Sequence, residues 1–166
     1  MLSRLKKARI DLATMHRLLP EAERIAQEQG DEYPSAEHLV AAALSLDDGI
    51  AAATLAAHGV DREGWLEAVR QQHHDALGSI GLHIGAAIPD QPLPAPESAT
   101  GPLRSQRSFQ DAFQRAVSLA KQERTPLTSA HVLLAAIQAD HGTVARTLAR
   151  LGLDPTALAA ELRTHL

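Results

Sequence analysis

Two histidines in this sequence have the side-chain chemistry for catalysis or metal binding. His38 and His131 lie at matching places in two similar segments, Ser-Ala-Glu-His-Leu-Val and Thr-Ser-Ala-His-Val-Leu. An imidazole can act as a general base or as a metal ligand. Both histidines, however, are followed by aliphatic residues at helical spacing, which favours a histidine that hydrogen-bonds to the neighbouring backbone. We therefore predict a structural role for His38 and His131.

Other combinations of catalytic residues are missing from the sequence. His73 and His74 are adjacent on a predicted helix, so their side chains diverge by about 100° and cannot bind one ion together. No Gly-x-Ser-x-Gly or His-Glu-x-x-His motif occurs. The chain has no cysteine, which excludes thiolate nucleophiles and cysteine metal sites. The sequence therefore predicts a protein that is not an enzyme and holds no metal ion or cofactor.

The elements that position these residues are predicted to be helices. Aromatic residues make up only 2% of the chain, and alanine and leucine take their place, so helices can approach closely while strand-favouring residues are scarce. The net charge of −4 gives no global positive field for nucleic acid. No apolar run approaches the ~20 residues that span a bilayer. We expect an all-α, cytoplasmic protein with neither nucleic acid nor a membrane as its partner.

Residues 1–17 differ from the rest of the chain in charge. Five Lys and Arg residues stand against Asp11, a local charge of +4. Apolar residues recur here at helical spacing: Leu2, Leu5, Leu12, Met15 and Leu19. We interpret this segment as an extra amino-terminal helix. Targeting peptides and membrane-surface helices share these features, so a helical DNA- or membrane-associated regulator that uses this basic segment is the alternative function.

A proline- and glycine-rich stretch, residues 78–107, divides the chain, because no helix tolerates that proline density. The flanking segments, 18–77 and 108–166, form a repeat with an offset of 93 residues. This offset pairs His38 with His131 and Trp65 with Leu158. Core packing is the first interpretation of Trp65, and an exposed binding anchor is the alternative.

Each half is predicted to form four helices. The first half predicts helices over 20–29, 36–46, 50–58 and 62–77, and the second over 108–123, 129–139, 143–151 and 155–165. Glycines end the third helix of each half, at Gly59 and Gly152. Predicted N-caps are Ser35, Asp61, Ser108 and Asp154. The fold class is all-α, with two pseudo-symmetric four-helix repeats forming one domain, an extra N-terminal helix and a Pro-rich linker.

The paired segments resemble the double Clp repeat of the N-terminal domains of Clp ATPases, of the ClpA and ClpC type. The first copy of the family's motif reads Ala36-Glu37-His38-Leu39, Asp48-Gly49, Ala51-Ala52, Leu55 and Gly59. The second reads Ser129-Ala130-His131-Val132, His141-Gly142, Val144-Ala145, Leu148 and Gly152. Ser108-Phe109-Gln110 is similar to the opening of the second repeat in ClpA-like members.

This resemblance implies a non-catalytic module of a chaperone and protease system that recruits adaptors and substrates. Some ClpC-type members bind phosphorylated arginine through a Thr-Glu pair just before the histidine, and some bind peptide antibiotics. Here the first repeat keeps the glutamate as Glu37 but has Ala36 in place of the threonine. The second keeps a hydroxyl at Ser129 but has Ala130 in place of the glutamate. No Gly-x4-Gly-Lys-Ser/Thr phosphate loop occurs. We therefore expect a repeat protein without an ATPase module, either free-standing or cut from a longer chain.

We expect partners to bind at the seam between the repeats, where a groove would accept a peptide or a partner helix. The predicted partner-binding residues are Glu37, Ser129, Phe109 and Phe113. The implied partners are a Clp adaptor, a client protein, a peptide ligand or the Clp unfoldase and protease complex, which a free-standing copy would recruit or sequester. An acidic run in the first repeat has two interpretations, a solvated face or a contact for a basic adaptor: Glu21, Glu23, Glu28, Asp31 and Glu32.

Overall fold

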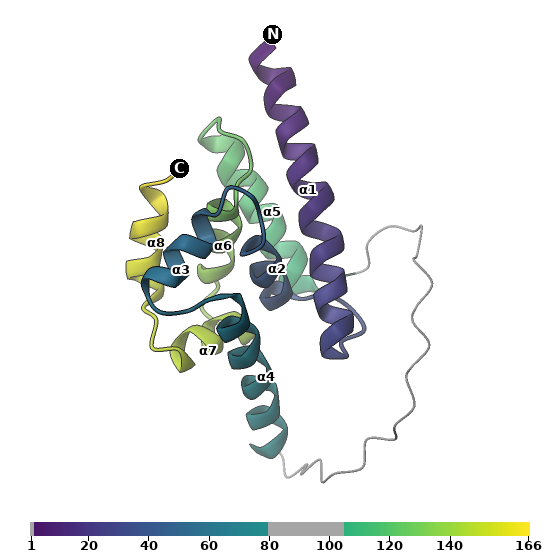
Figure 1. Cartoon of the computed structure of the whole chain (residues 1–166), viewed down its shortest axis with the longest axis vertical. Coiled ribbons are helices and arrows are strands. Elements are labelled where there is room, and N and C mark those ends of the chain that lie inside the picture. The colour runs from purple at the N-terminus through teal and green to yellow at the C-terminus, as the bar shows by residue number, and fades with distance from the viewer. Residues whose placement is uncertain (1, 80–104) are drawn as a thin grey trace.

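The computed structural model describes residues 2–79 and 105–166, which form eight α-helices and no strand (Figure 1). The first half contains α1 (Leu2–Gln29), α2 (Ala36–Ala43), α3 (Ile50–Ala57) and α4 (Arg62–Ser79). The second half contains α5 (Arg107–Gln122), α6 (Ser129–Ile137), α7 (Thr143–Arg150) and α8 (Pro155–Arg163). The all-α prediction is confirmed. Most of the predicted linker, residues 80–104, lies outside the described residues, while Gly78 and Ser79 belong to α4.

Helix α1 is one continuous helix of 28 residues, where the sequence predicts two helices separated at Pro20. Pro20 lies on the exposed side of α1, so the carbonyl that loses its helical partner can be hydrated. The amino-terminal half is held from a distant part of the chain. The carboxylate of Asp11 accepts the backbone N–H of Leu127 at 2.7 Å, and the hydroxyl of Thr14 donates to the Leu127 carbonyl at 3.3 Å.

Local signals fix most of the helix starts. Asp154 accepts the N–H of Thr156 at 2.9 Å ahead of Pro155, and Asp61 accepts the N–H of Gly64 at 2.7 Å. The prediction that Ser108 is the N-cap of its own helix is wrong. Helix α5 begins one residue earlier, and the Ser108 hydroxyl accepts the N–H of Ala36, the first residue of α2, at 3.3 Å.

Two glycines stop helices as predicted from the repeat. Gly59 and Gly152 follow the ends of α3 and α7, with φ values of 76° and 68°. This left-handed conformation carries no steric penalty for glycine and lets the chain turn into the next helix. The same turn therefore ends the third helix of both repeats.

Helices α2 and α6 form the centre of the molecule, and all of their residues are buried. They pack against each other, with α1 against α2 and α5 against α6 (Figure 1). The repeats interlock, because α3 of the first repeat packs on α6 and α8, and α4 packs on α7. Alanines in the two central helices, such as Ala41 and Ala135, allow this close approach. Both repeats therefore share one hydrophobic core.

Trp65 belongs to this core. Its side chain is fully buried, and its indole N–H donates to the backbone carbonyl of Glu37 at 3.1 Å. The polar end of the indole is thus satisfied inside the protein. The core interpretation of Trp65 is confirmed, and an exposed binding anchor is excluded.

Candidate partner-binding site

Glu37 lies at the start of α2 and is 6% exposed. Its carboxylate forms an ion pair with the imidazole of His73 on α4, with 3.4 Å between Oε1 and Nε2. Burial alone raises the pKa of Glu37, but hydrogen bonds from His73, its own backbone and Ser35 outweigh burial and leave that pKa lowered. The same contact raises the pKa of His73. Glu37 is therefore a charged group held inside the protein by a partially exposed histidine.

Replacing Glu37 with glutamine is expected to lower the pKa of His73, because the carboxylate is the largest cause of its elevation. The ion pair contributes stability that is lost as pH rises through the raised pKa of His73, above 6.5, or falls through the lowered pKa of Glu37, below 4.5. NMR titration of the ring protons measures this pKa, with the histidines other than His38 as the internal control, because Glu37 also acts on the pKa of His38. An unchanged His73 titration would show that the pair does not form.

Ser129, at the start of α6, is fully buried and joins the two repeats. Its backbone N–H donates to the carboxylate of Asp48 at 2.9 Å, and its hydroxyl donates to the same carboxylate. The hydroxyl also accepts the N–H of Ala51 at 2.9 Å. The start of a helix favours an anion, because its N–H groups are unpaired and its dipole is positive there. In this chain the anion is the protein's own Asp48, from the turn between α2 and α3.

Replacing Asp48 with alanine is expected to lower the free energy of unfolding by about 2 kcal/mol, because two charge-assisted hydrogen bonds to Ser129 are lost. Asp47 is the matched control. Its side chain is 78% exposed and pairs on the surface with Arg17, so alanine there should cause a much smaller change. Urea unfolding of both variants measures the difference. Equal effects would contradict the role of Asp48.

The two motif histidines have equivalent surroundings, and each is 1% exposed. His38 Nδ1 accepts the N–H of Ser35 at 3.0 Å, and His131 Nδ1 accepts the N–H of Thr128 at 3.2 Å. The serine and threonine hydroxyls lie 2.9 and 2.7 Å from the same nitrogens. Each imidazole thus closes the first turn of a central helix, as a glutamate does in a capping box.

The opposite ring nitrogen of each histidine faces a carboxylate. His38 Nε2 lies 3.2 Å from Asp31, and His131 Nε2 lies 3.3 Å from Glu123. Burial lowers the pKa of both histidines in spite of these carboxylates. Because Nδ1 of each ring accepts a backbone N–H, the ring carries its proton on Nε2. No group of three or more potential metal ligands occurs among the described residues.

The predicted aromatic contacts lie at the start of α5. Phe109 is 2% exposed and Phe113 is partly buried, with the ring centroids 6.3 Å apart and the rings stacked. Of the four predicted residues, Ser129 has hydrogen bonds across the boundary between the repeats, while Glu37 pairs within the first repeat. Phe109, Glu37 and Ser129 are buried in the structure, and their role in partner binding stays a prediction. The two hollows described next are lined by other residues.

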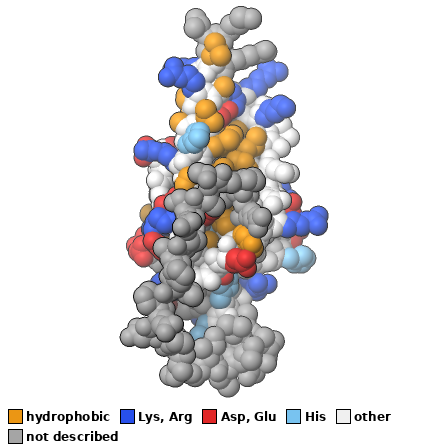
Figure 2. All heavy atoms as spheres, turned by 90° about the vertical axis from the view of Figure 1, so that its right-hand side faces the viewer, with side chains coloured by type: hydrophobic (Ala, Val, Ile, Leu, Met, Phe, Trp, Pro, Cys, Tyr) orange, Lys and Arg blue, Asp and Glu red, His pale blue; other side chains and the backbone are white. Residues whose placement is uncertain are grey.

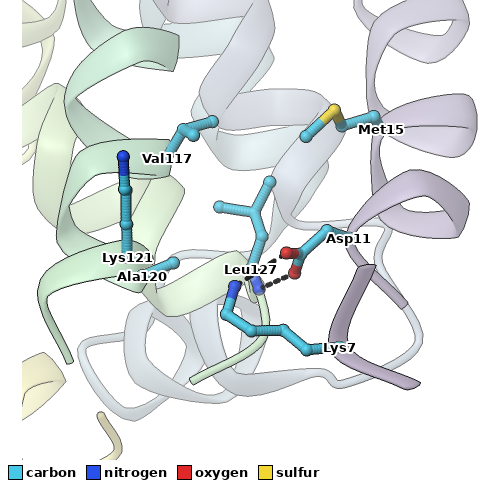
Figure 3. A pocket seen from close by; sticks show the side chains of 7 residues that line it. All are labelled: Lys7, Asp11, Met15, Val117, Ala120, Lys121 and Leu127. Atoms are coloured by element: carbon cyan, nitrogen blue, oxygen red, sulfur yellow. Dashed lines mark hydrogen bonds and ion pairs between the residues drawn. The ribbon is translucent and has the colours of Figure 1, made fainter. Parts of the chain in front are cut away.

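One hollow lies between α1 and α5 and has a volume of about 150 Å³ (Figure 3). Its apolar wall comes from both helices and from the segment before α6, and its rim carries charged groups. It is lined by Lys7, Asp11, Met15, Val117, Ala120, Lys121 and Leu127. Lys7 pairs with Asp11 at 2.7 Å. This site can hold one apolar side chain beside a lysine.

A second and larger hollow, of about 350 Å³, lies where α7 and α8 meet the end of α6. Apolar residues such as Ile137 and Leu148 form part of its wall, and Asp140 and Arg163 add opposite charges. Sequence reasoning missed both hollows, because the first joins segments far apart in the chain and the second depends on how three consecutive helices pack. The one signal for the first hollow was the basic amphipathic pattern of residues 1–17.

Fold and site together define a pseudo-symmetric double repeat of four-helix units, whose two central helices each begin with a histidine cap. The family described as "Clp repeat (R) N-terminal domain" matches residues 13–88 and 104–166. The chain belongs to this family.

Solved structures show the same fold. The chain is similar to the N-terminal domain of the caseinolytic protease associated chaperone ClpD from Arabidopsis thaliana, with 16% identity, a TM-score of 0.59, and coverage of 92% of this chain and 91% of that chain. It is also similar to a structure from preliminary investigations of a malarial protein secretion system, with 14% identity, a TM-score of 0.58 and the same coverage. The search of curated proteins found no match.

Proposed function

We propose that this chain is a non-catalytic protein-binding module that recruits or sequesters adaptors, substrates or peptide ligands of a Clp protease system. The observation that carries the proposal is the match of both repeats to the Clp repeat N-terminal domain, together with one core shared by the two repeats. The sequence holds no Gly-x4-Gly-Lys-Ser/Thr motif, so ATP-driven unfolding would need residues outside these 166. We also propose that the module acts in the cytoplasm.

The buried ion pairs and caps bear on the ligand class. In the second repeat, the helix start that would receive a phosphate group holds the carboxylate of Asp48. In the first repeat, Glu37 is paired with His73. A phosphorylated arginine would have to displace one of these internal contacts. We therefore favour adaptors, clients or peptides bound on the outer surface over a phosphoarginine ligand at these two positions.

The experiment adds the purified chain to a degradation reaction run by the Clp unfoldase and peptidase of the same organism. One reporter substrate requires an adaptor, and the control substrate is degraded without one. We expect the chain to inhibit only adaptor-dependent degradation, with half-inhibition near the concentration of the unfoldase, because both N-terminal domains compete for one adaptor. If neither rate changes at large excess, and no adaptor binds the immobilised chain, the proposal fails.

A further inference from the structure

The amino-terminal part of α1 presents apolar side chains to solvent. Leu5, Ile10 and Leu12 are 65%, 39% and 55% exposed, and they are the exposed large hydrophobic residues of the chain wherever side chains are described. Figure 2 shows hydrophobic side chains running along this part of the molecule, with Lys and Arg side chains on both sides. These three exposed residues precede residue 13, where the family match begins.

The apolar residues of α1 follow a heptad pattern that continues beyond the body of the protein. The a and d positions are Leu5, Ala8, Leu12, Met15, Leu19, Ala22 and Ala26. Ala22 and Ala26 are buried in the core, while Met15 and Leu19 are partly buried against it. Leu5, Ala8 and Leu12 are exposed. At this end of α1 the body is contacted by Asp11 and Thr14, so Leu5, Ala8 and Leu12 lie beside the packed face, and no described residue covers them.

Charge accompanies this apolar stripe, which we define as Leu5, Ala8 and Leu12. Arg9, at the e position, flanks it, and Lys6, at the b position, adds positive charge on the same stretch of α1; both are exposed. Residues 1–17 carry +4 while the whole chain carries −4, so the remaining residues carry −8. A partner that fits the stripe therefore needs an apolar stripe of its own and negative charge beside it.

We infer that the stripe binds an acidic amphipathic helix of another protein, an inference that rests on the proposed function and names its partner's chemistry. A second copy fits poorly. Its stripe carries the same positive charge, and its acidic surface offers no exposed large hydrophobic residue among the described side chains. A lipid surface also fits poorly, because the stripe is narrow and lacks aromatic anchors.

The dimensions fit a short helix. At 1.5 Å per residue, Leu5 and Leu12 lie about 10 Å apart along the axis, and Leu19 adds about 10 Å more. A partner helix of about four turns therefore covers the line from Leu5 to Leu19 on α1. The hollow of about 150 Å³ borders this line at Met15 and can accept one apolar side chain of the partner. Lys121, which also lines the hollow, can pair with a carboxylate next to that side chain (Figure 3).

The test uses the full 166-residue chain and a designed helical peptide of three heptads, with leucine at a and d and glutamate at e and g. A second peptide has lysine in place of glutamate. We expect the acidic peptide alone to bind in isothermal titration calorimetry, and salt to weaken the binding, because salt screens surface charge. Leu5→Ser with Leu12→Ser, and separately Lys6→Glu with Arg9→Glu, should each weaken it at least about tenfold.

The matched control is Arg70→Glu with Arg146→Glu, which makes the same charge change on exposed residues of α4 and α7. This variant should bind the acidic peptide within about twofold of the unchanged chain. Circular dichroism verifies that each variant is folded. No binding of the acidic peptide, or equal binding by the Leu5 and Leu12 variant, would overturn the inference.

Two further measurements separate the other occupants. Analytical ultracentrifugation that shows dimers lost on Leu5→Ser with Leu12→Ser would assign the stripe to a second copy, and vesicles containing phosphatidylglycerol that bind through it would assign it to a membrane. Either result overturns the inference. If adaptors bind the stripe variants unchanged, the proposed function stands and this inference fails. If the acidic peptide binds but no Clp component does, the proposed function fails alone.

Discussion

Replacing Trp65 with alanine is expected to lower the free energy of unfolding by about 4 kcal/mol, one of the two largest effects we predict. The side chain is fully buried, so the substitution leaves a large cavity in the core that both repeats share. It also removes the indole N–H that donates to the Glu37 carbonyl at 3.1 Å. A buried carbonyl without a donor adds to the cost of the cavity.

The repeat supplies the matched control for this prediction. Leu158 occupies the equivalent position of the second repeat and is 1% exposed. Trp65→Leu should therefore lose less stability than Trp65→Ala, because leucine refills part of the volume. Urea unfolding followed by circular dichroism at 222 nm measures all variants, since removing the only tryptophan removes the usual fluorescence signal. A loss below about 1 kcal/mol for Trp65→Ala would contradict the described packing.

The fold was predictable from the sequence wherever its cause is local. Glycine at positions 59 and 152 ends a helix by its own conformational freedom, and Asp154 before Pro155 starts one by its own hydrogen bond. Pro20 was misleading for the same reason. Its local preference predicts a helix start, whereas contacts of Asp11 and Thr14 with Leu127, more than 100 residues away, hold α1 as one helix.

The candidate site was less predictable, because its contacts join residues that are far apart in the chain. The motif placed Glu37 and Ser129 at helix starts, and the structure agrees. What the sequence does not encode locally is that His73 reaches Glu37 and Asp48 reaches Ser129. His73 thus pairs with Glu37 within the first repeat, and Asp48 joins Ser129 to the first repeat. The exposed Leu5 and Leu12 were recognised as a helical pattern, but only the fold shows that nothing described covers them.

Lowering the pH below 6.5 is expected to destabilise the protein through His38 and His131. Burial lowers the pKa of both in the folded state, so between that lowered pKa and 6.5 the unfolded chain binds more protons than the folded one. Stability therefore falls with falling pH, by up to about 1.4 kcal/mol per pH unit for each histidine. His73 acts in the opposite sense, because its raised pKa favours the folded state as pH falls towards 6.5.

The variant that tests this prediction is His38→Gln with His131→Gln. Glutamine does not titrate and can still accept the N–H of Ser35 or Thr128, as it does in a capping box. We expect lower stability at pH 7, by about 1 kcal/mol per site, and a shallower fall of stability between pH 6.5 and 5. Urea midpoints over this range measure both effects. An unchanged slope would contradict the assignment of the acid sensitivity to His38 and His131.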